Sequence, residues 1–213
     1  MKYYFFSDGA SEPTNPGPSA FAFVELSDYH DKRELYSFYQ YIGFTTNNVA
    51  ELKGINAIFE HIINNKEKYL SDPTSEIYIY SDSKYALNCI SLWYPIWVKT
   101  NKLSSKKNLD LIRPMYDTYL HICSKVRLRM EWVKGHNGHW GNERADQLCN
   151  KALEESNNIE PVIRYNQLMD EAHIISIRLA IVKSELSELH AKLTGKEIHY
   201  LDLSIAITNK KHL

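Results

Sequence analysis

Four acidic residues, far apart in the 213-residue chain, have the types and local settings of a metal site. They stand in the short patterns Ser-Asp-Gly, Thr-Asn-Asn-Val-Ala-Glu, Ser-Asp-Ser and Asn-Glu-Arg-Ala-Asp, as Asp8, Glu51, Asp82 and Asp146. Carboxylates that are scattered in sequence and meet only in the fold suit hard divalent cations, which take oxygen ligands. Because clustered carboxylates repel one another without a cation, the set predicts a divalent-metal site. Mg²⁺ fits best, since it keeps waters that phosphate oxygens can replace.

Each acid also has an ordinary structural explanation. Glu51 follows Asn48 by three residues, as in a helix capping arrangement. Asp82 precedes a helix start, where an acid favours the helix dipole, and Asp8 before a glycine suits a turn. Asp146 is compatible with a solvated helical charge. Taken together the metal site is favoured, because strand ends and helix N-termini of an α/β sheet are where functional sites collect.

The elements that position these acids can be predicted from hydrophobic periodicity and turn residues. Strands are expected at 2–8, 19–26, 33–42, 77–80 and 126–133. Helices are expected at 47–64, from Ser83 to a break at Pro95, at 108–122 and at 142–155. Asp8 then ends the first strand, Asp82 ends the fourth, and Glu51 lies in the first turn of the helix between them. A mixed α/β sheet with helices on its faces satisfies this order, and neighbouring strands would bring the three acids to one edge.

Composition narrows the class of protein. Hydrophobic residues make up 44% and charged residues 24%, which indicates a globular chain. The net charge of -1 does not indicate nucleic-acid binding, so any polyanion contact must come from local patches. The apolar run at the start of the chain is too short for a signal peptide, and no apolar stretch is long enough to span a membrane. We therefore expect no membrane partner and an intracellular location, in the cytoplasm or with a nucleoid or nucleus.

The patterns around the four acids, with Trp-Val-Lys-Gly-His at 132–136, resemble a type 1 ribonuclease H in order and spacing. The similarity covers about residues 1–155, and the long segment from Trp132 to Asp146 carries most of its specificity. It implies the ribonuclease H-like fold over 1–155. That fold is a mixed five-stranded sheet, with three antiparallel strands and then two parallel additions, flanked by helices. A mainly helical C-terminal extension would follow.

The resemblance implies an endonuclease that cleaves the RNA strand of RNA–DNA hybrids by two-metal hydrolysis, leaving 5′-phosphate and 3′-hydroxyl ends. The residues implied to hold two Mg²⁺ ions, with Mn²⁺ as a substitute, are Asp8, Glu51, Asp82 and Asp146. His136 matches the family's mobile histidine, which assists water attack or product release, a task that suits a group titrating near neutral pH. His139 is expected to be structural.

Substrate contacts also follow from the resemblance. The amides implied to bond the RNA 2′-hydroxyls are Asn15, Asn47 and Asn48. The aromatic residues that match the DNA-strand channel are Tyr85 and Trp93, for which core burial is the alternative. The residues that match a DNA phosphate pocket are Thr46 and Asn108.

Lysines add further expected substrate contacts. Lys84 occupies a position that is often neutral in the family. A shortened version of the family's basic protrusion is expected at Lys99, Lys102, Lys106 and Lys107, although a run of lysines in a loop is usually only a solvated face.

Residues 156–161 read as a linker, and residues 162–213 lie outside the resemblance. A helix is expected at about 165–194, ended by Gly195 and followed by a short apolar segment at 198–205. Its apolar residues recur at heptad spacing, at Leu168, Ala172, Ile175, Leu179, Val182, Leu186, Leu189 and Leu193. A parallel pair is disfavoured because Arg178 would face Lys183. An antiparallel homodimer and docking on the catalytic domain remain equally open.

Two other functions are weighed against a hybrid-specific nuclease. One is a nuclease of the same fold with a relaxed substrate range, such as duplex RNA or flapped primers. The other is a non-catalytic hybrid-binding module, which the retained carboxylates argue against, because unused clustered acids only cost stability. Primer removal, R-loop clearance and reverse transcription all fit the sequence equally well.

Overall fold

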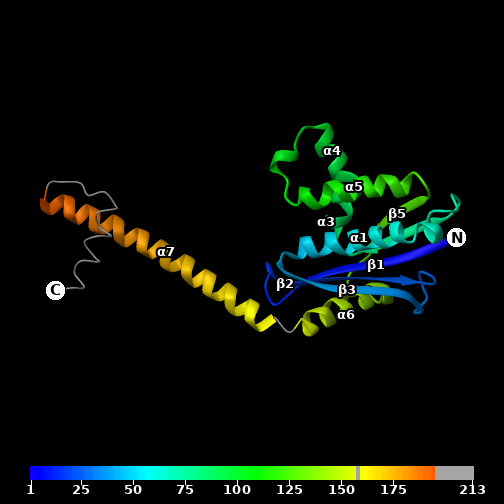
Figure 1. The fold of residues 1–213 in the computed structure, drawn as a ribbon, viewed down its shortest axis with the longest axis horizontal. Helices are drawn as coiled ribbons and strands as arrows, with labels where there is room; N and C mark the ends of the chain where they lie inside the picture. The colour runs from blue at the N-terminus through cyan, green and yellow to red at the C-terminus, as the bar shows by residue number, and fades with distance from the viewer. Residues whose placement is uncertain (157–158, 195–213) are drawn as a thin grey trace. The chain divides into compact units, whose positions relative to one another are not determined.

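A computed structural model describes residues 1–156 and 159–194 of the chain (Figure 1). The chain divides into an N-terminal unit, Met1–Glu160, and a C-terminal unit, Pro161–Leu213, and each is described by itself. Within the described ranges, no helix combines the length and the apolar character needed to cross a membrane.

The N-terminal unit is built on one five-stranded sheet in the order β3-β2-β1-β4-β5. The strands are β1 (Lys2–Ser11), β2 (Gly17–Leu26), β3 (Glu34–Thr45), β4 (Glu76–Ser81) and β5 (Arg127–Trp132). The first three are antiparallel, whereas β4 runs parallel to both β1 and β5. The predicted mixed sheet with two parallel additions is confirmed.

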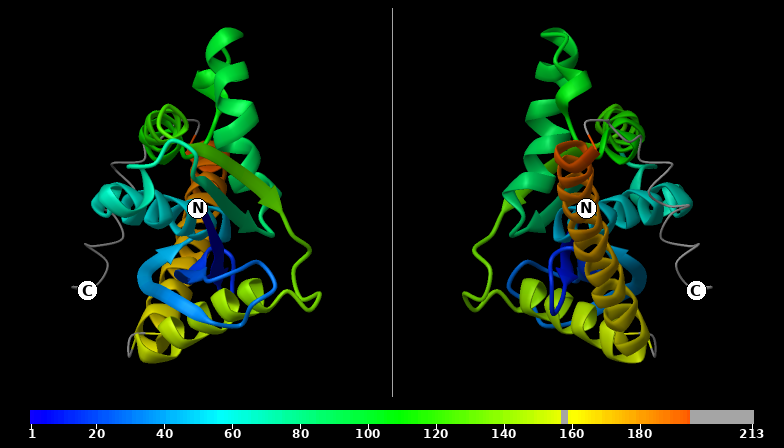
Figure 2. Two further views of the ribbon diagram at one scale, coloured as in Figure 1. Left: turned by 90° about the vertical axis from the view of Figure 1, so that its right-hand side faces the viewer. Right: turned by 90° about the vertical axis from the view of Figure 1, so that its left-hand side faces the viewer.

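Helices cover both faces of this sheet, with α1 and α5 on one side and α6 on the other (Figure 1, Figure 2). The helices of this unit are α1 (Asn47–Asn64), α2 (Lys66–Tyr69), α3 (Lys84–Asn88), α4 (Tyr94–Lys99), α5 (Leu109–Cys123) and α6 (Trp140–Glu155). Successive residues of β1 serve opposite faces, as a strand requires. Phe5 packs in the core with Leu52 of α1, and Phe6 packs in a second cluster with Leu148 of α6. Two buried layers therefore fix the sheet between its helices.

The expected break at Pro95 is wrong. A π-helical segment, Cys89–Trp93, joins α3 directly to α4, and Pro95 lies in the first turn of α4. The Tyr94 N–H just before it closes the π-helical segment on the Cys89 carbonyl oxygen, and Pro95 has no N–H of its own to continue the ladder. The helical path therefore runs on to Lys99 and carries Trp97 with it.

The described part of the C-terminal unit is one long helix, α7 (Ile159–Thr194). It begins inside the stretch expected as a linker, and Thr194 is its last described residue, so the stop expected at Gly195 lies outside the described residues. The apolar segment expected at 198–205 lies outside the described residues.

Candidate active site

Three of the four predicted acids meet in the fold. Asp8 from β1, Glu51 from α1 and Asp82 after β4 each offer a carboxylate oxygen, and these oxygens all lie within 4.8 Å of one another. Asp8 is 8% exposed and Glu51 is 5% exposed, so two of these acids are buried. We call Asp8, Glu51 and Asp82 the acidic triad.

The parallel pairing of β1 and β4 brings Asp8 and Asp82 together. Ser7 pairs with Ser81 in the last register position that the two strands share, and the acids are the next residue of each chain segment. However, β1 does not end at Asp8 as predicted, because Asp8 itself continues the antiparallel pairing with Ala22 of β2. Only Asp82 marks the end of a strand.

Glu51 meets Asp8 and Asp82 from the second turn of α1, one turn later than the sequence suggested. Thr46 is the N-cap, and its Oγ1 accepts a hydrogen bond from the Val49 N–H at 3.4 Å. The capping explanation and the first-turn placement of Glu51 are therefore both wrong. Gly9 permits the contact between α1 and β1, since a Cβ there would collide with the backbone N of Glu51.

The electrostatics of the triad fit a bound divalent cation. Burial, then the nearby Asp82 carboxylate, raises the pKa of Asp8 to about 8, while a hydrogen bond from the Gly9 N–H opposes the shift. Burial, then the charges of Asp8 and Asp82, raises the pKa of Glu51 well above its usual range. Among the described residues, Glu51 Oε2 is buried and accepts no hydrogen bond. Buried carboxylates with an unused oxygen are the donor set that a hard cation takes.

Three residues hold Asp82 in place, and all belong to the segment that carried the family resemblance. The Trp132 indole Nε1–H donates to the backbone oxygen of Asp82 at 2.9 Å. The Asn142 side-chain amide donates to Asp82 Oδ2 at 3.2 Å. Gly135 lies so close that a Cβ there would collide with Asp82 Oδ2. Sequence reasoning assigned no role to these residues individually, because their partner is distant along the chain.

The acidic cluster found among the described residues includes neither Asp146 nor His136. Asp146, on α6, is half-buried, accepts a hydrogen bond from Asn150 at 3.4 Å, and helps to raise the pKa of Asp8. His136 is exposed in the turn between β5 and α6, with a left-handed φ of 50°. His139 instead precedes α6, and its Nε2 lies 2.9 Å from the Tyr29 hydroxyl, a contact that fits a structural residue.

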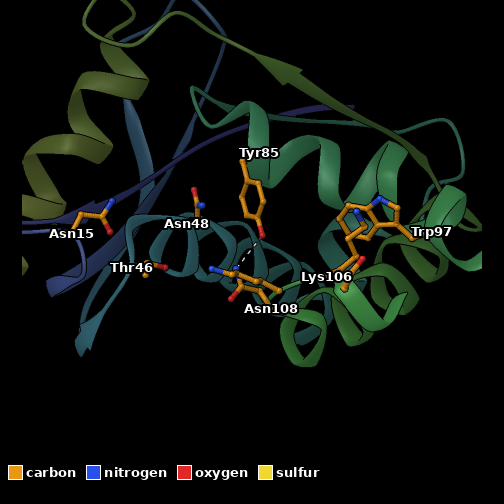
Figure 3. Close-up of a pocket in the computed structure, with 9 residues that line it drawn as sticks. Asn15, Thr46, Asn48, Tyr85, Trp97, Lys106 and Asn108 are labelled. Carbon is orange, nitrogen blue, oxygen red and sulfur yellow. Dashed lines mark hydrogen bonds between the residues drawn. The ribbon is translucent and has the colours of Figure 1, made fainter. Parts of the chain in front are cut away.

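A cavity of about 570 Å³ gathers most of the predicted substrate residues. Figure 3 shows its labelled side chains spread from Asn15 at one end to Trp97 and Lys106 at the other. The residues that line it, which we call the groove, are Asn15, Thr46, Asn48, Tyr85, Trp97, Ser105, Lys106, Lys107 and Asn108. Within it, the Asn108 amide donates to the Tyr85 hydroxyl at 3.0 Å, and Lys106 Nζ lies 5.1 Å from the Trp97 ring centroid.

Other predicted contacts lie outside the groove. Trp93 packs against the core between Tyr85 and Trp97. It is therefore partly buried, in the direction of the core burial that was the alternative to a channel contact. Lys84 stands 4.1 Å from the ring centroid of Trp132. The remaining predicted residues that do not line the groove are Asn47, Lys99 and Lys102. Sequence reasoning missed Trp97 and Ser105; the helical spacing of Trp93 and Trp97 was the available signal.

Comparisons with known proteins identify what the N-terminal unit is similar to. The family described as RNase H matches residues 1–154. Ribonuclease HI of Helicobacter pylori is 37% identical over 144 residues, covering 68% of this chain and 87% of that protein. Ribonuclease H of Bartonella bacilliformis is 34% identical over 154 residues, covering 70% and 88%.

Solved structures are similar over the same part of the chain. The N-terminal RNase H domain of rv2228c from Mycobacterium tuberculosis is 25% identical with a TM-score of 0.52, covering 74% of this chain and 97% of that one. LC11-RNase H1, isolated from compost, matches in fold with a TM-score of 0.55 at 24% identity, covering 73% and 97%.

Proposed function

The chain belongs to the ribonuclease H family, and from that membership we propose that it hydrolyses the RNA strand of RNA–DNA hybrids as an endonuclease. The observation that carries the proposal is the convergence of Asp8, Glu51 and Asp82, from three elements, within 4.8 Å of one another. Clustered buried carboxylates cost stability, so their retention favours a working metal site over a silent binding module.

We assign two Mg²⁺ ions to the site, with Mn²⁺ as a substitute. The triad supplies oxygen ligands only, which suits these hard ions, and we assign Asp146, whose charge acts on Asp8, as the fourth acid of the site. When bound, such ions activate the attacking water and stabilise charge on the leaving 3′-oxygen, leaving 5′-phosphate and 3′-hydroxyl ends.

The chain's own residues orient this chemistry. Asn142 and Trp132 fix the carboxylate and backbone of Asp82, so that the ligand does not have to reorganise when a cation arrives. His136 stands exposed on its turn, and we assign it the task of the family's mobile histidine, which assists water attack or product release.

The groove is the proposed path of the hybrid. Asn15 and Asn48 present amides that can bond 2′-hydroxyls, the groups that distinguish RNA from DNA. Thr46 Oγ1 accepts from Val49, which leaves its own O–H to donate to a phosphate oxygen. Lys106 and Lys107 add positive charge at the far end. We further propose that the enzyme works where hybrids occur, in the cytoplasm or with a nucleoid or nucleus.

Cleavage of a labelled RNA–DNA hybrid with Mg²⁺ tests this function, in parallel with single-stranded RNA, duplex RNA and duplex DNA. We expect cutting of the RNA strand in the hybrid alone, and none with EDTA. Equal cutting of duplex RNA would show that the enzyme is a nuclease with a relaxed substrate range rather than a hybrid-specific one. Tight hybrid binding without cutting in Mg²⁺ or Mn²⁺ would leave a binding module.

A further inference from the structure

The helix α7 carries a long apolar stripe that is exposed in the described chain. The stripe residues with large side chains range from 39% exposed at Leu186 to 84% at Leu193. Residues at alternating four- and three-residue intervals form the stripe, at Leu168, Ala172, Ile175, Leu179, Val182, Leu186, Leu189 and Leu193. Such spacing follows one side of a helix and matches a facing helix with the same repeat. A continuous apolar seam of this length marks an interaction surface.

We propose that a second copy of this chain covers the stripe, with the two α7 helices antiparallel and Leu179 opposite Val182. In this register every stripe residue meets another stripe residue of the second copy. The facing pairs are Leu168 with Leu193, Ala172 with Leu189, Ile175 with Leu186, and Leu179 with Val182. The two stripes therefore overlap over their whole length, and every stripe residue has a partner on the other helix.

Charges along one edge of the stripe select this register. Arg178 lies opposite Glu185 of the second copy, and Glu171 lies opposite Lys192, so that each attractive pair forms twice by symmetry. Side chains on a helix lean toward its N-terminus, so in antiparallel helices Arg178 and Glu185 lean toward each other. The edge therefore complements itself in this one arrangement.

Other arrangements place like charges together. A shift of one heptad in one direction brings Arg178 against its own copy and Glu171 against Glu185. The opposite shift brings Glu185 against its own copy and Arg178 against Lys192. A parallel pair sets Arg178 against Lys183. Like charges across such a seam suppress the wrong partner geometry.

The second edge of the stripe includes a single lysine and no acid. It carries Met169, Ser176, Lys183 and His190. The two copies of Lys183 are offset by about 7 Å along the axis at the helical rise per residue and lean toward each other, so this edge adds one repulsive pair against the four attractive pairs of the first edge. The separate patch of Ile174, Ile177 and Ile181 lies on the other side of α7 and takes no part in this seam.

An antiparallel pair attaches the two N-terminal units at opposite ends of the helix pair. The two chains enter α7 roughly 60 Å apart, from the helical rise per residue and the register above. Given the proposed function, long hybrids could then be held by two active sites at once, and binding would gain from effective concentration. Self-association itself does not depend on the proposed function.

Light scattering on the full chain, from 1 to 100 μM, tests the pairing through charge variants. We expect wild type to form a dimer, and Arg178→Glu to raise its dissociation constant by roughly tenfold, because two attractive pairs become repulsive. The double variant Arg178→Glu/Glu185→Arg should restore wild-type dimerisation. Ser184→Glu, on the exposed side of α7 away from the stripe, is the matched control and should change nothing.

A monomer mass for wild type at the highest concentration would overturn the proposal. Tighter association of Arg178→Glu would also overturn it, since this variant gains an attraction only in the rejected arrangements, to Lys183 in a parallel pair or to Lys192 in the shifted antiparallel pair. If the double variant does not regain the wild-type dissociation constant, the proposed register is wrong. Thermal unfolding of every variant serves as the folding check, and cleavage of a short hybrid is measured separately, so that loss of dimerisation is distinguished from a failure of the proposed function.

Discussion

Asn142, in the first turn of α6, donates its side-chain amide to Asp82 Oδ2 at 3.2 Å, across 60 residues of sequence. The donor residue is 2% exposed and Asp82 is half-buried, so this hydrogen bond is partly shielded from water. It ties the helix on one face of the sheet to the acid at the end of β4. The orientation of Asp82 therefore depends on α6 as well as on its own strand.

We expect Asn142→Ala to weaken Mg²⁺ affinity and the cleavage rate by about 10- to 100-fold, as for other residues that orient a metal ligand. Titration of cleavage rate against Mg²⁺ concentration measures the shift. Gln147→Ala, at an exposed position of the same helix, is the control and should match wild type. An unchanged Mg²⁺ titration for Asn142→Ala would show that Asp82 keeps its position without the amide.

Gly135→Ala should reduce cleavage at least tenfold while leaving the fold intact. The added Cβ would collide with Asp82 Oδ2, so the carboxylate has to move away from Asp8 and Glu51. Small displacements of catalytic groups are known to cost large factors in rate. The rate constant kcat and the Tm should be measured together, with exposed Lys134→Ala as the neighbouring control. Full activity of Gly135→Ala would mean that Asp82 needs no close approach there.

Stability in EDTA should fall as pH rises from 5 to 8 because of the triad. The pKa of Asp8 is raised to about 8 in the fold, against 3.8 as its ordinary value, so the folded state binds more protons in that interval. Unfolding then releases protons, and the free energy of unfolding decreases with pH until the folded group has ionised. Saturating Mg²⁺ should remove this loss by compensating the charge.

The pH effect is isolated by comparing thermal unfolding of wild type and Asp8→Asn in EDTA. Burial lowers the pKa of His61, so this histidine acts with the opposite sign as pH falls through its ordinary value of 6.5. Both proteins carry His61, and the difference between them reports Asp8. A difference in Tm that stays constant from pH 5 to 8 would contradict the prediction.

Lys106→Ala should raise KM for the hybrid about three- to tenfold with little change in kcat, and should flatten the dependence of KM on salt. Lys106 lines the groove and stacks over Trp97, whereas exposed Lys99 does not line it. Lys99→Ala is therefore a control of equal charge change. Equal effects of both substitutions would indicate bulk charge rather than a groove contact.

Periodicity predicted much of the fold because local patterns and burial agree. The helix α1 spans 47–64 as expected, since its buried residues, such as Leu52, Ile55 and Phe59, recur at helical spacing. The strand β1 was expected to stop at Asp8, but its pairing with β2 continues to Ser11, and pairing partners are not visible in one segment. Element ends that depend on a neighbour could not be predicted locally.

The sequence predicted that acids would meet, and three of the four do, but it did not predict the contacts that support them. Thr46 and Asn48 are both good capping residues, and only the fold shows that Thr46 caps α1 and leaves Glu51 in its second turn. Trp97 was missed because Pro95 normally ends a helix, whereas here the π-helical segment places that proline in a first turn. Contacts of Asp82 with Gly135 and Asn142 are purely tertiary.

The cleavage rate of an RNA–DNA hybrid by Asp82→Asn, with Mg²⁺, tests the central claim most directly. Asp110→Asn, which changes an exposed acid at the start of α5, is the matched control. We predict that Asp82→Asn loses at least a thousandfold in rate, since an amide supplies a neutral and poorer ligand to the cation. Asp110→Asn should cut the RNA strand at the wild-type rate. Comparable rates for Asp82→Asn and wild type would contradict a catalytic metal site at Asp8, Glu51 and Asp82.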